Sequence, residues 1–323
     1  MAAALTTLLA LAVLGGLISA FFYLAVLFGG FGALILGYLA PLPLFAAGLW
    51  AGASVALLAG LAGAVAVMVV SSGSVLVPLT YLVTAAAPAV LVCRQVLLAR
   101  VVPGDGPEGG LEWYPPGRTL MGLVGMGVAA LLAAAGLTLD QPGGLEGVVR
   151  RILARIAEPV FSAQGQTAPD PDAMWMAAAL PGLVVVSWLT MTIVNAALAQ
   201  GALMRFGRNR RPAMRLVDLD LPWWLAPAFL GAILAASVLP DPLGFLALNL
   251  ALILTVPFAF AGLSVVHAFA RRRSARVPIL IGFYLFLFLF GWPILLLVGL
   301  GMIEQWIGLR RRLTAAGPGQ EDE

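Results

Sequence analysis

Residues 44–70 read LFAAGLWAGASVALLAGLAGAVAVMVV, and this stretch decides the fold class because none of its side chains can carry a charge. It lies inside a longer block, residues 1–93, that contains no Asp, Glu, Lys, Arg, His, Asn or Gln. A helix needs about 20 apolar residues to cross the roughly 30 Å hydrocarbon core of a bilayer. The block is therefore long enough for four short spans, and it predicts a membrane protein.

The composition of the whole chain indicates the same class. Of its 323 residues, 62% are hydrophobic and only 10% are charged, whereas a soluble domain carries about 25% charged residues. This composition excludes a soluble enzyme core. All 18 basic residues are arginines that cluster between apolar runs, a pattern typical of cytoplasmic loops and not of a nucleic-acid surface. Cys93 is the only cysteine, so no intrachain disulfide can form.

The spans are found by locating the loops between them, where Arg, Asp, Glu, Pro and Gly accumulate, because charge and unpaired backbone are costly in lipid. After the uncharged block, the apolar stretches cover residues 118–138, 173–203, 222–239, 243–270 and 277–308. Weaker signals divide the block itself at Gly15-Gly16 with Phe21-Phe22, at Pro41 and Pro43, and at residues 71–74. The predicted fold class is all-α: a polytopic transmembrane bundle of about 8–10 spans.

The best count is ten spans, and it depends on the last apolar stretch. Residues 277–308 are too long for one ordinary span, so we expect a hairpin that turns at Gly291-Trp292-Pro293. The alternative is one long, tilted helix and nine spans. Summed over alternate loops, twelve arginines fall on one side and three on the other. The positive-inside rule then places both termini in the cytoplasm and the protein in the inner (cytoplasmic) membrane.

One loop is predicted to contain an amphipathic helix over residues 144–160. Its apolar residues recur at helical spacing, namely Leu145, Val148, Val149, Ile152, Ile156 and Val160. Such a helix is expected to lie flat on a membrane surface or to cap the bundle. The predicted organisation is an uncharged transmembrane block (1–93), a loop plus span (94–138), the amphipathic helix and a polar loop (139–172), a C-terminal transmembrane block (173–313) and a disordered tail (314–323).

Catalytic chemistry is not indicated. The sequence has no phosphate-binding loop, no zinc-protease motif and no nucleophile elbow, so we expect no enzyme, no cofactor and no metal. His267 and Glu304 are ionisable, but they lie near span ends, where such residues are more often satisfied by the interface or by an arginine.

Neutral polar residues offer a candidate ligand-binding face on the stretch 173–203. Ser187, Thr190 and Asn195 fall within about 140° of helical arc, and Trp188 lies beside them. They could line a cavity. The alternative is that they bond to neighbouring helices, at about 0.6 kcal/mol each.

Small residues recur every fourth position in the N-terminal block. The two main ladders are Ala12, Gly16 and Ala20, and Gly48, Gly52, Ala56 and Gly60. Such ladders let helices approach closely. They indicate packing within the bundle or, as the alternative, an interface for another membrane subunit.

The order of several motifs resembles the YybS-like family of bacterial integral membrane proteins. The motifs are Pro41-Leu42-Pro43-Leu44-Phe45, Asp220-Leu221-Pro222-Trp223-Trp224, Gly301-Met302-Ile303-Glu304 and Arg310-Arg311-Arg312. That family is in turn similar to the S components of energy-coupling-factor transporters. The resemblance implies a small-solute-binding membrane fold without an ATPase of its own, and it implies that the ladder Ala12, Gly16 and Ala20 docks a membrane partner.

Two functions are consistent with these patterns. The first is a small-solute-binding or transport-related subunit, whose ligand we expect to be neutral or apolar because the first 93 residues carry no charge. The second is a membrane scaffold or an assembly and morphogenesis protein that acts through helix–helix contacts. Either function requires the lipid bilayer as a partner, and neither involves nucleic acid.

Overall fold

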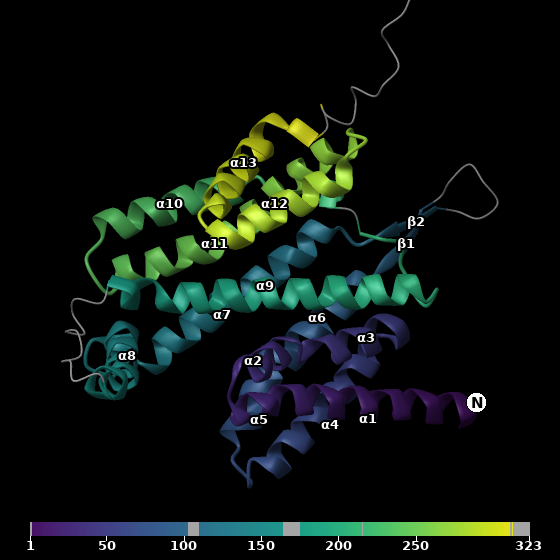
Figure 1. Ribbon diagram of the computed structural model, residues 1–323, viewed down its shortest axis with the longest axis horizontal. Helices are drawn as coiled ribbons and strands as arrows, with labels where there is room; N and C mark the ends of the chain where they lie inside the picture. Colours follow the sequence, from purple (N-terminus) through teal and green to yellow (C-terminus); the bar gives the residue numbers. More distant parts are fainter. Residues whose placement is uncertain (1, 103–109, 164–174, 215, 311, 313–323) are drawn as a thin grey trace, which may run out of the picture. The chain divides into compact units, whose positions relative to one another are not determined.

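The structure is a computed structural model that describes residues 2–102, 110–163, 175–214, 216–310 and 312 (Figure 1). Within these ranges, seven helices are long and apolar enough to cross a membrane, and three further apolar helices are shorter. The chain is therefore a mainly helical, multi-pass membrane protein. The predicted disordered tail and most of the predicted polar loop lie outside the described residues.

The helices follow the chain in this order: α1 Ala2–Leu24, α2 Phe31–Tyr38, α3 Pro41–Ala51, α4 Ala53–Val70, α5 Leu76–Tyr81, α6 Ala87–Val96, α7 Pro116–Leu137, α8 Gly144–Ala163, α9 Trp175–Arg205, α10 Leu225–Val238, α11 Leu243–Arg271, α12 Arg276–Phe290 and α13 Pro293–Ile307. Shorter elements are the 3₁₀ turns η1 Ala25–Phe28 and η4 Leu216–Asp218, the π-helical turn η2 Leu82–Ala86, and the strands β1 Ala99–Val102 and β2 Gly110–Trp113.

The chain forms two compact units. Unit 1 comprises Met1–Leu123 and Trp188–Met214, and unit 2 comprises Val124–Ser187 and Arg215–Glu323. The second half of α9 thus belongs to the N-terminal unit, a division that differs from the linear blocks expected from the sequence. Each unit is described by itself below.

In unit 1, α4 is the central helix and packs against α1, α3 and α6. Glycines make the α1–α4 contact close. A methyl group added to Gly16 would overlap the Ala59 carbonyl oxygen and would lie 2.8 Å from the Gly63 backbone nitrogen. Close backbone approach at small residues is a main source of helix association in lipid.

The small-residue ladders lie within this packing. Ala12 and Ala20 are 2% and 1% exposed on α1, and Gly48, Ala56 and Gly60 are also buried. A methyl group on Gly60 would meet the Ala86 side chain at 2.7 Å. Docking of a partner on these positions stays a prediction, and it would require unit 1 to open.

The small-residue ladder Gly48, Gly52, Ala56 and Gly60 does not lie on one continuous helix, because α3 ends at Ala51 and α4 begins at Ala53. The chain turns at Gly52, whose φ of 120° is accessible to glycine but strained for other residues. The helices α3 and α4 then pack directly on each other, with Gly48 facing Ala56. A ladder of period four cannot reveal the break, because the small residues continue across it.

A second boundary also differs from expectation. No helix ends at Gly15-Gly16 or Phe21-Phe22; instead α1 continues to Leu24 and the chain turns at Gly29 and Gly30, with φ of 70° and 86°. Gly15 and Gly16 are helical and serve packing. The four candidate spans in residues 5–96 nevertheless agree in number with the four expected.

The predicted loop 94–118 contains an antiparallel hairpin that sequence reasoning missed. Strands β1 and β2 pair Arg100 with Glu112, and the two side chains form an exposed ion pair at 2.6 Å. The sequence does contain a pattern typical of a hairpin: two short runs with apolar residues stand on either side of residues 103–106, which are Pro, Gly, Asp and Gly.

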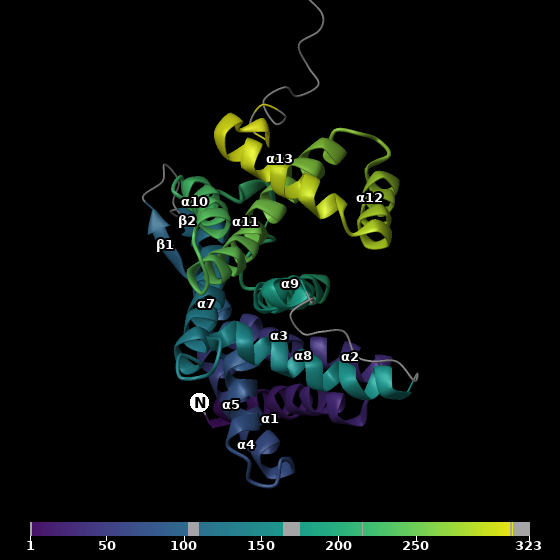
Figure 2. The same ribbon diagram turned by 90° about the vertical axis from the view of Figure 1, so that its left-hand side faces the viewer.

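In unit 2, α11 is the central helix and packs against α10, α12 and α13 (Figure 2). Gly262 and Gly301 bring α11 and α13 into backbone contact. A methyl group on Gly301 would overlap the Phe258 carbonyl oxygen and would lie 2.9 Å from the Gly262 nitrogen. This crossing fixes the position of the residues that follow Gly301 on α13.

Two other expectations concern unit 2. The hairpin turn is confirmed: α12 ends at Phe290, Gly291 adopts a φ of 67°, and α13 begins at Pro293. A single long helix over 277–308 is wrong. The expected helix over 144–160 is present as α8, with Ile152 and Ile156 exposed, and its placement on a membrane surface stays a prediction.

We predict that Gly16→Ala destabilises unit 1. The added methyl group has no space against α4, and overpacking typically costs about 1–3 kcal/mol. Thermal unfolding of the full-length protein in mild detergent should show a lower midpoint. The matched control is Gly125→Ala on α7, where no described atom lies within 4 Å and alanine favours the helix. Equal midpoints for the two variants would contradict the packing described.

Candidate functional site

The polar face predicted on α9 contacts the backbone of other helices. Trp188 Nε1 donates to the Thr84 carbonyl at 2.8 Å, and Asn195 Nδ2 donates to the Tyr38 carbonyl at 2.7 Å. Asn195 is buried, Ser187 and Trp188 are half-buried, and Thr190 is exposed. Ser187 lies in unit 2 and the other three in unit 1. The observed bonds are those of the helix-contact alternative, and ligand binding on this face stays a prediction.

The Trp188 bond has a cause in the sequence. Pro88 has no N–H, so it cannot donate to the Thr84 carbonyl four residues earlier, and its ring crowds that carbonyl. The helix relaxes there into the π-helical turn η2. Trp188 supplies the missing donor. Asn195 acts similarly at the last residue of α2, where a helix leaves carbonyls without intrahelical partners.

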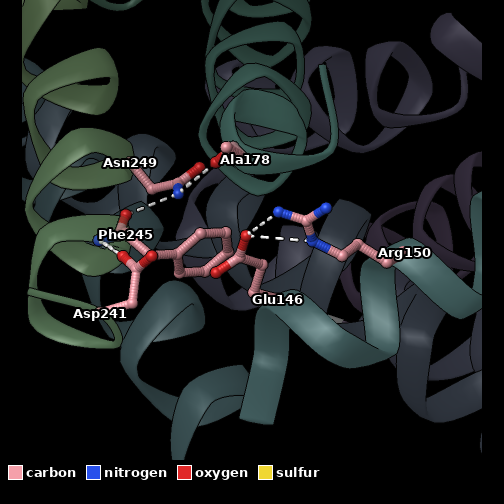
Figure 3. A network of polar contacts seen from close by, with 6 residues as sticks. All are labelled: Glu146, Arg150, Ala178, Asp241, Phe245 and Asn249. Atoms are coloured by element: carbon pink, nitrogen blue, oxygen red, sulfur yellow. Dashed lines mark hydrogen bonds and ion pairs between the residues drawn. The ribbon is translucent and has the colours of Figure 1, made fainter. Parts of the chain in front are cut away.

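Unit 2 has a clearer case of a side chain that bonds to the helix backbone near a proline. Here α9 contains Pro181. A regular helix would join Gly182 N–H to the Ala178 carbonyl. Instead, Gly182 N–H donates to Asn249 Oδ1 at 2.6 Å. Asn249 Nδ2 donates to the Ala178 carbonyl at 2.8 Å, and Figure 3 shows this second bond. The amide of Asn249 thus bridges a backbone bond that the proline has opened.

Asn249 is fully satisfied in this position. Its Nδ2 also donates to the Phe245 carbonyl on its own helix at 2.8 Å, and the side chain is 0% exposed. One turn earlier, Asp241 Oδ1 accepts from Phe245 N–H at 3.0 Å near the start of α11. Figure 3 shows these bonds together with the Glu146–Arg150 pair of α8. The arrangement is structural, because every polar atom of Asn249 already has a partner.

Unit 2 also has a cleft of about 530 Å³, here called the C-terminal cleft. Its walls are the C-terminal half of α13, Ala261 of α11 and the segment that precedes α10. The lining residues are Asp220, Leu221, Ala261, Gly301, Glu304, Gln305, Trp306, Ile307, Gly308, Arg310 and Arg312. Gly301, where α11 and α13 cross, forms part of this wall. The close packing of these two helices therefore also shapes the cleft.

A buried ion pair lies in the wall of the C-terminal cleft. Gly308 ends α13 in the left-handed conformation and turns the chain back. Arg310 then donates to Glu304 twice, from its backbone N–H to Oε2 at 3.0 Å and from Nε to Oε1 at 2.7 Å. Glu304 is 4% exposed. The expectation that Glu304 is satisfied by an arginine is confirmed, and a buried pair of this kind persists only with several hydrogen bonds.

Other polar groups of the C-terminal cleft are accessible or lack partners. The Asp220 carboxylate is 75% exposed and meets Arg310 Nη2 at 3.4 Å. Arg312 is exposed. Gln305 Nε2 donates to the Pro222 carbonyl at 2.7 Å, but its buried Oε1 accepts no hydrogen bond from the described residues. An unpaired buried acceptor is costly, so this atom would gain from a ligand or water that donates to it.

The other ionisable residue noted in the sequence, His267, lies apart from the lining of this cleft. Its Nδ1 lies 3.0 Å from the Leu263 carbonyl on its own helix, and its Nε2 lies 3.4 Å from the Tyr284 hydroxyl. Among the described residues, no group of three His, Cys, Asp or Glu side chains is arranged to hold a metal ion.

Residues 163–304 match the family described as Predicted membrane protein (DUF2232). The match supports the expectation that the chain is a membrane protein. It does not confirm the resemblance to the YybS-like family or to energy-coupling-factor S components. No curated protein and no solved structure matches the chain. The matched region runs from the end of α8 to Glu304, so it contains Asn249, Asp220 and the α11–α13 crossing, while Gln305, Arg310 and Arg312 follow it.

Sequence reasoning missed Gln305 and Arg310 as members of a cleft. Arg310 appeared as a topology signal at the end of the last span, and Gln305 did not stand out. The spacing from Glu304 across Gly308 to Arg310 is the available signal, because a glycine after a helix allows the chain to return onto its last turn. Nothing local in the sequence indicates that Asp220 joins them.

We predict that Asn249→Leu lowers the stability of unit 2. It leaves Gly182 N–H and the Ala178 carbonyl without their bridge, at about 1–3 kcal/mol for each buried group. The midpoint of thermal unfolding should fall clearly. The matched control is Ser264→Ala on the same helix, because Ser264 is equally buried but bonds only to Ala261 on its own turn.

A double-mutant cycle tests the cause. In a Pro181→Ala background, residue 181 regains its N–H and Gly182 can bond directly to Ala178. Asn249→Leu should then cost less than in the parent chain, with a coupling of about 0.5–3 kcal/mol. Additive losses would contradict the bridging role.

Proposed function

We propose that this chain is a small-solute-binding membrane protein, acting as a binding or transport subunit, and that the solute occupies the C-terminal cleft. The observation that supports it most is the cleft itself, which is lined by the accessible groups of Asp220 and Arg312 and by Gln305, whose buried Oε1 has no partner among the described residues. The cleft volume of about 530 Å³ falls within the range of about 300–1,000 Å³ found for ligand sites.

The chemistry of the cleft changes the expected ligand. A neutral or apolar solute was expected because the first 93 residues carry no charge. The cleft instead presents the exposed groups of Asp220 and Arg312 next to apolar surface from Leu221 and Ile307. A polar solute, recognised by hydrogen bonds to these charged groups beside a smaller apolar surface, suits this lining better.

The proposal includes the topology expected from the sequence. Ten spans with both termini in the cytoplasm would place the Arg310 end of α13 on the cytoplasmic side of the inner membrane. A binding role needs no enzyme activity and no cofactor. An additional membrane subunit would supply the energy for transport, since no ATP-binding motif occurs in the sequence.

A scaffold or morphogenesis role is the other function considered. Its motivation was the set of small-residue ladders, and these positions are buried within unit 1 except Gly52, which is half-buried. The ligand cleft of unit 2 has no counterpart in that role. We therefore favour solute binding.

The test is native mass spectrometry of the full-length protein after gentle extraction. We expect a bound molecule that copurifies, or that is regained from a panel of small polar solutes. Gln305→Leu should lower its occupancy severalfold, because a buried hydrogen bond is lost. Gln141→Leu, at an exposed residue that is not part of the cleft lining, should leave occupancy unchanged.

A second measurement applies if Gln305→Leu is too unstable. Cys93 is buried, so a Cys93→Ala chain with Ile307→Cys carries one reactive thiol at the cleft. Bound solute should slow maleimide labelling at this position and not at Val238→Cys on α10. A wild-type protein that binds nothing in either assay would overturn the proposal.

A further inference from the structure

The geometry points to a zwitterion as the ligand of the C-terminal cleft: a molecule with one anionic group that pairs with Arg312 and one ammonium group that pairs with Asp220. This inference rests on the proposed function and narrows its ligand class. It follows from how the charges of the cleft divide between buried and exposed side chains.

Among the described residues, four charged side chains line the cleft, two acids and two arginines. Glu304 and Arg310 neutralise each other, since two short hydrogen bonds join them and their side chains are 3% and 11% exposed. Separating them would leave a buried charge without its partner, which is strongly unfavourable. Neither Glu304 nor Arg310 is therefore available to pair with a charged group of a ligand.

The other two charged side chains, Asp220 and Arg312, differ from this pair because both are accessible. Asp220 reaches Arg310 only at 3.4 Å, with 75% of its side chain exposed, and Arg312 is exposed on the turn after α13. One accessible anion and one accessible cation in a cleft of this size are complementary to a ligand that carries both signs. A ligand with a single charge would meet a repelling group as well as an attracting one.

Gln305 favours one orientation of the ligand in the cleft. Its Nε2 is held by the Pro222 carbonyl, so the amide is oriented and its Oε1 is an acceptor only. An ammonium group has three N–H donors, enough for the Asp220 carboxylate and for this amide oxygen once the Gln305 side chain shifts to expose it. The ammonium end of the ligand is thus expected between Asp220 and Gln305.

Such a zwitterion can come from two sources. The cleft is bordered by Trp306, and Trp223 and Trp224 follow Asp220 closely in sequence; all three rings are exposed, as in the aromatic belts at the level of lipid headgroups. The headgroup of an aminophospholipid has the required charges. A free zwitterionic solute, such as an amino acid or phosphoethanolamine, has them too.

The experiment uses the full-length protein and four probes. Nanodiscs of phosphatidylcholine containing phosphatidylethanolamine or phosphatidylglycerol supply the lipid arms, and phosphoethanolamine or glycerol 3-phosphate supplies the free arms. Lipid occupancy is read by native mass spectrometry and solute affinity by titration calorimetry. The variants are Asp220→Asn and Arg312→Gln, with Asp140→Asn and Arg272→Gln as exposed controls outside the cleft lining.

We expect the ethanolamine-bearing probe of one arm to bind more tightly than its anionic counterpart. Asp220→Asn should weaken it about tenfold, since a charge-assisted hydrogen bond is lost, and should not weaken the anionic probe, which this carboxylate repels. Arg312→Gln should weaken both probes, and the controls neither. Preference in the lipid arm identifies a headgroup, and preference in the free arm identifies a solute.

Two results would overturn the inference in different ways. If the anionic probe binds as well as the zwitterion and Asp220→Asn changes nothing, the ligand class is wrong while solute binding at the cleft stands. If no probe binds and no solute copurifies with the wild-type protein, both the ligand class and the proposed function fail.

Discussion

A lipid environment offers no water to the polypeptide backbone, so each N–H and C=O group within the hydrocarbon must find a partner in the protein. This constraint explains where the neutral polar side chains lie. Pro88 and Pro181 each remove a backbone N–H from a helix, and Trp188 and Asn249 bond to the backbone near each proline. Asn195 does the same at the end of α2.

The same constraint separates structural polar groups from those available to a ligand. Among the helical layers, Asn249 is engaged with the backbone on all sides, and Trp188 and Asn195 each donate to a backbone carbonyl. The C-terminal cleft lies instead at the end of α13, where the helix has ended and charged groups occur. There the Glu304–Arg310 pair holds the turn, and Asp220, Gln305 and Arg312 retain capacity for a ligand.

Much of the fold could be predicted because hydropathy and glycine act locally. The apolar stretches became helices, and the Gly291 turn between α12 and α13 was found from its sequence. The break at Gly52 could not be found, because its helix-like spacing continues through the turn. The cleft could not be found either: Asp220 and Glu304 are far apart in the chain, and their segments meet because η4 and α13 both pack on α11 and because Gln305 bonds to the Pro222 carbonyl. The partner of Asn249 was hidden for the same reason, since it lies on another helix.

The most direct test of this account is an electron cryo-microscopy map of the full-length protein in nanodiscs made from the native membrane. The account predicts ordered non-protein density in the C-terminal cleft, in contact with Gln305 Oε1 and between the side chains of Asp220 and Arg312, while Glu304 and Arg310 remain paired. A cleft closed by the protein's own side chains, with Asp220 and Arg312 paired to each other, would contradict it.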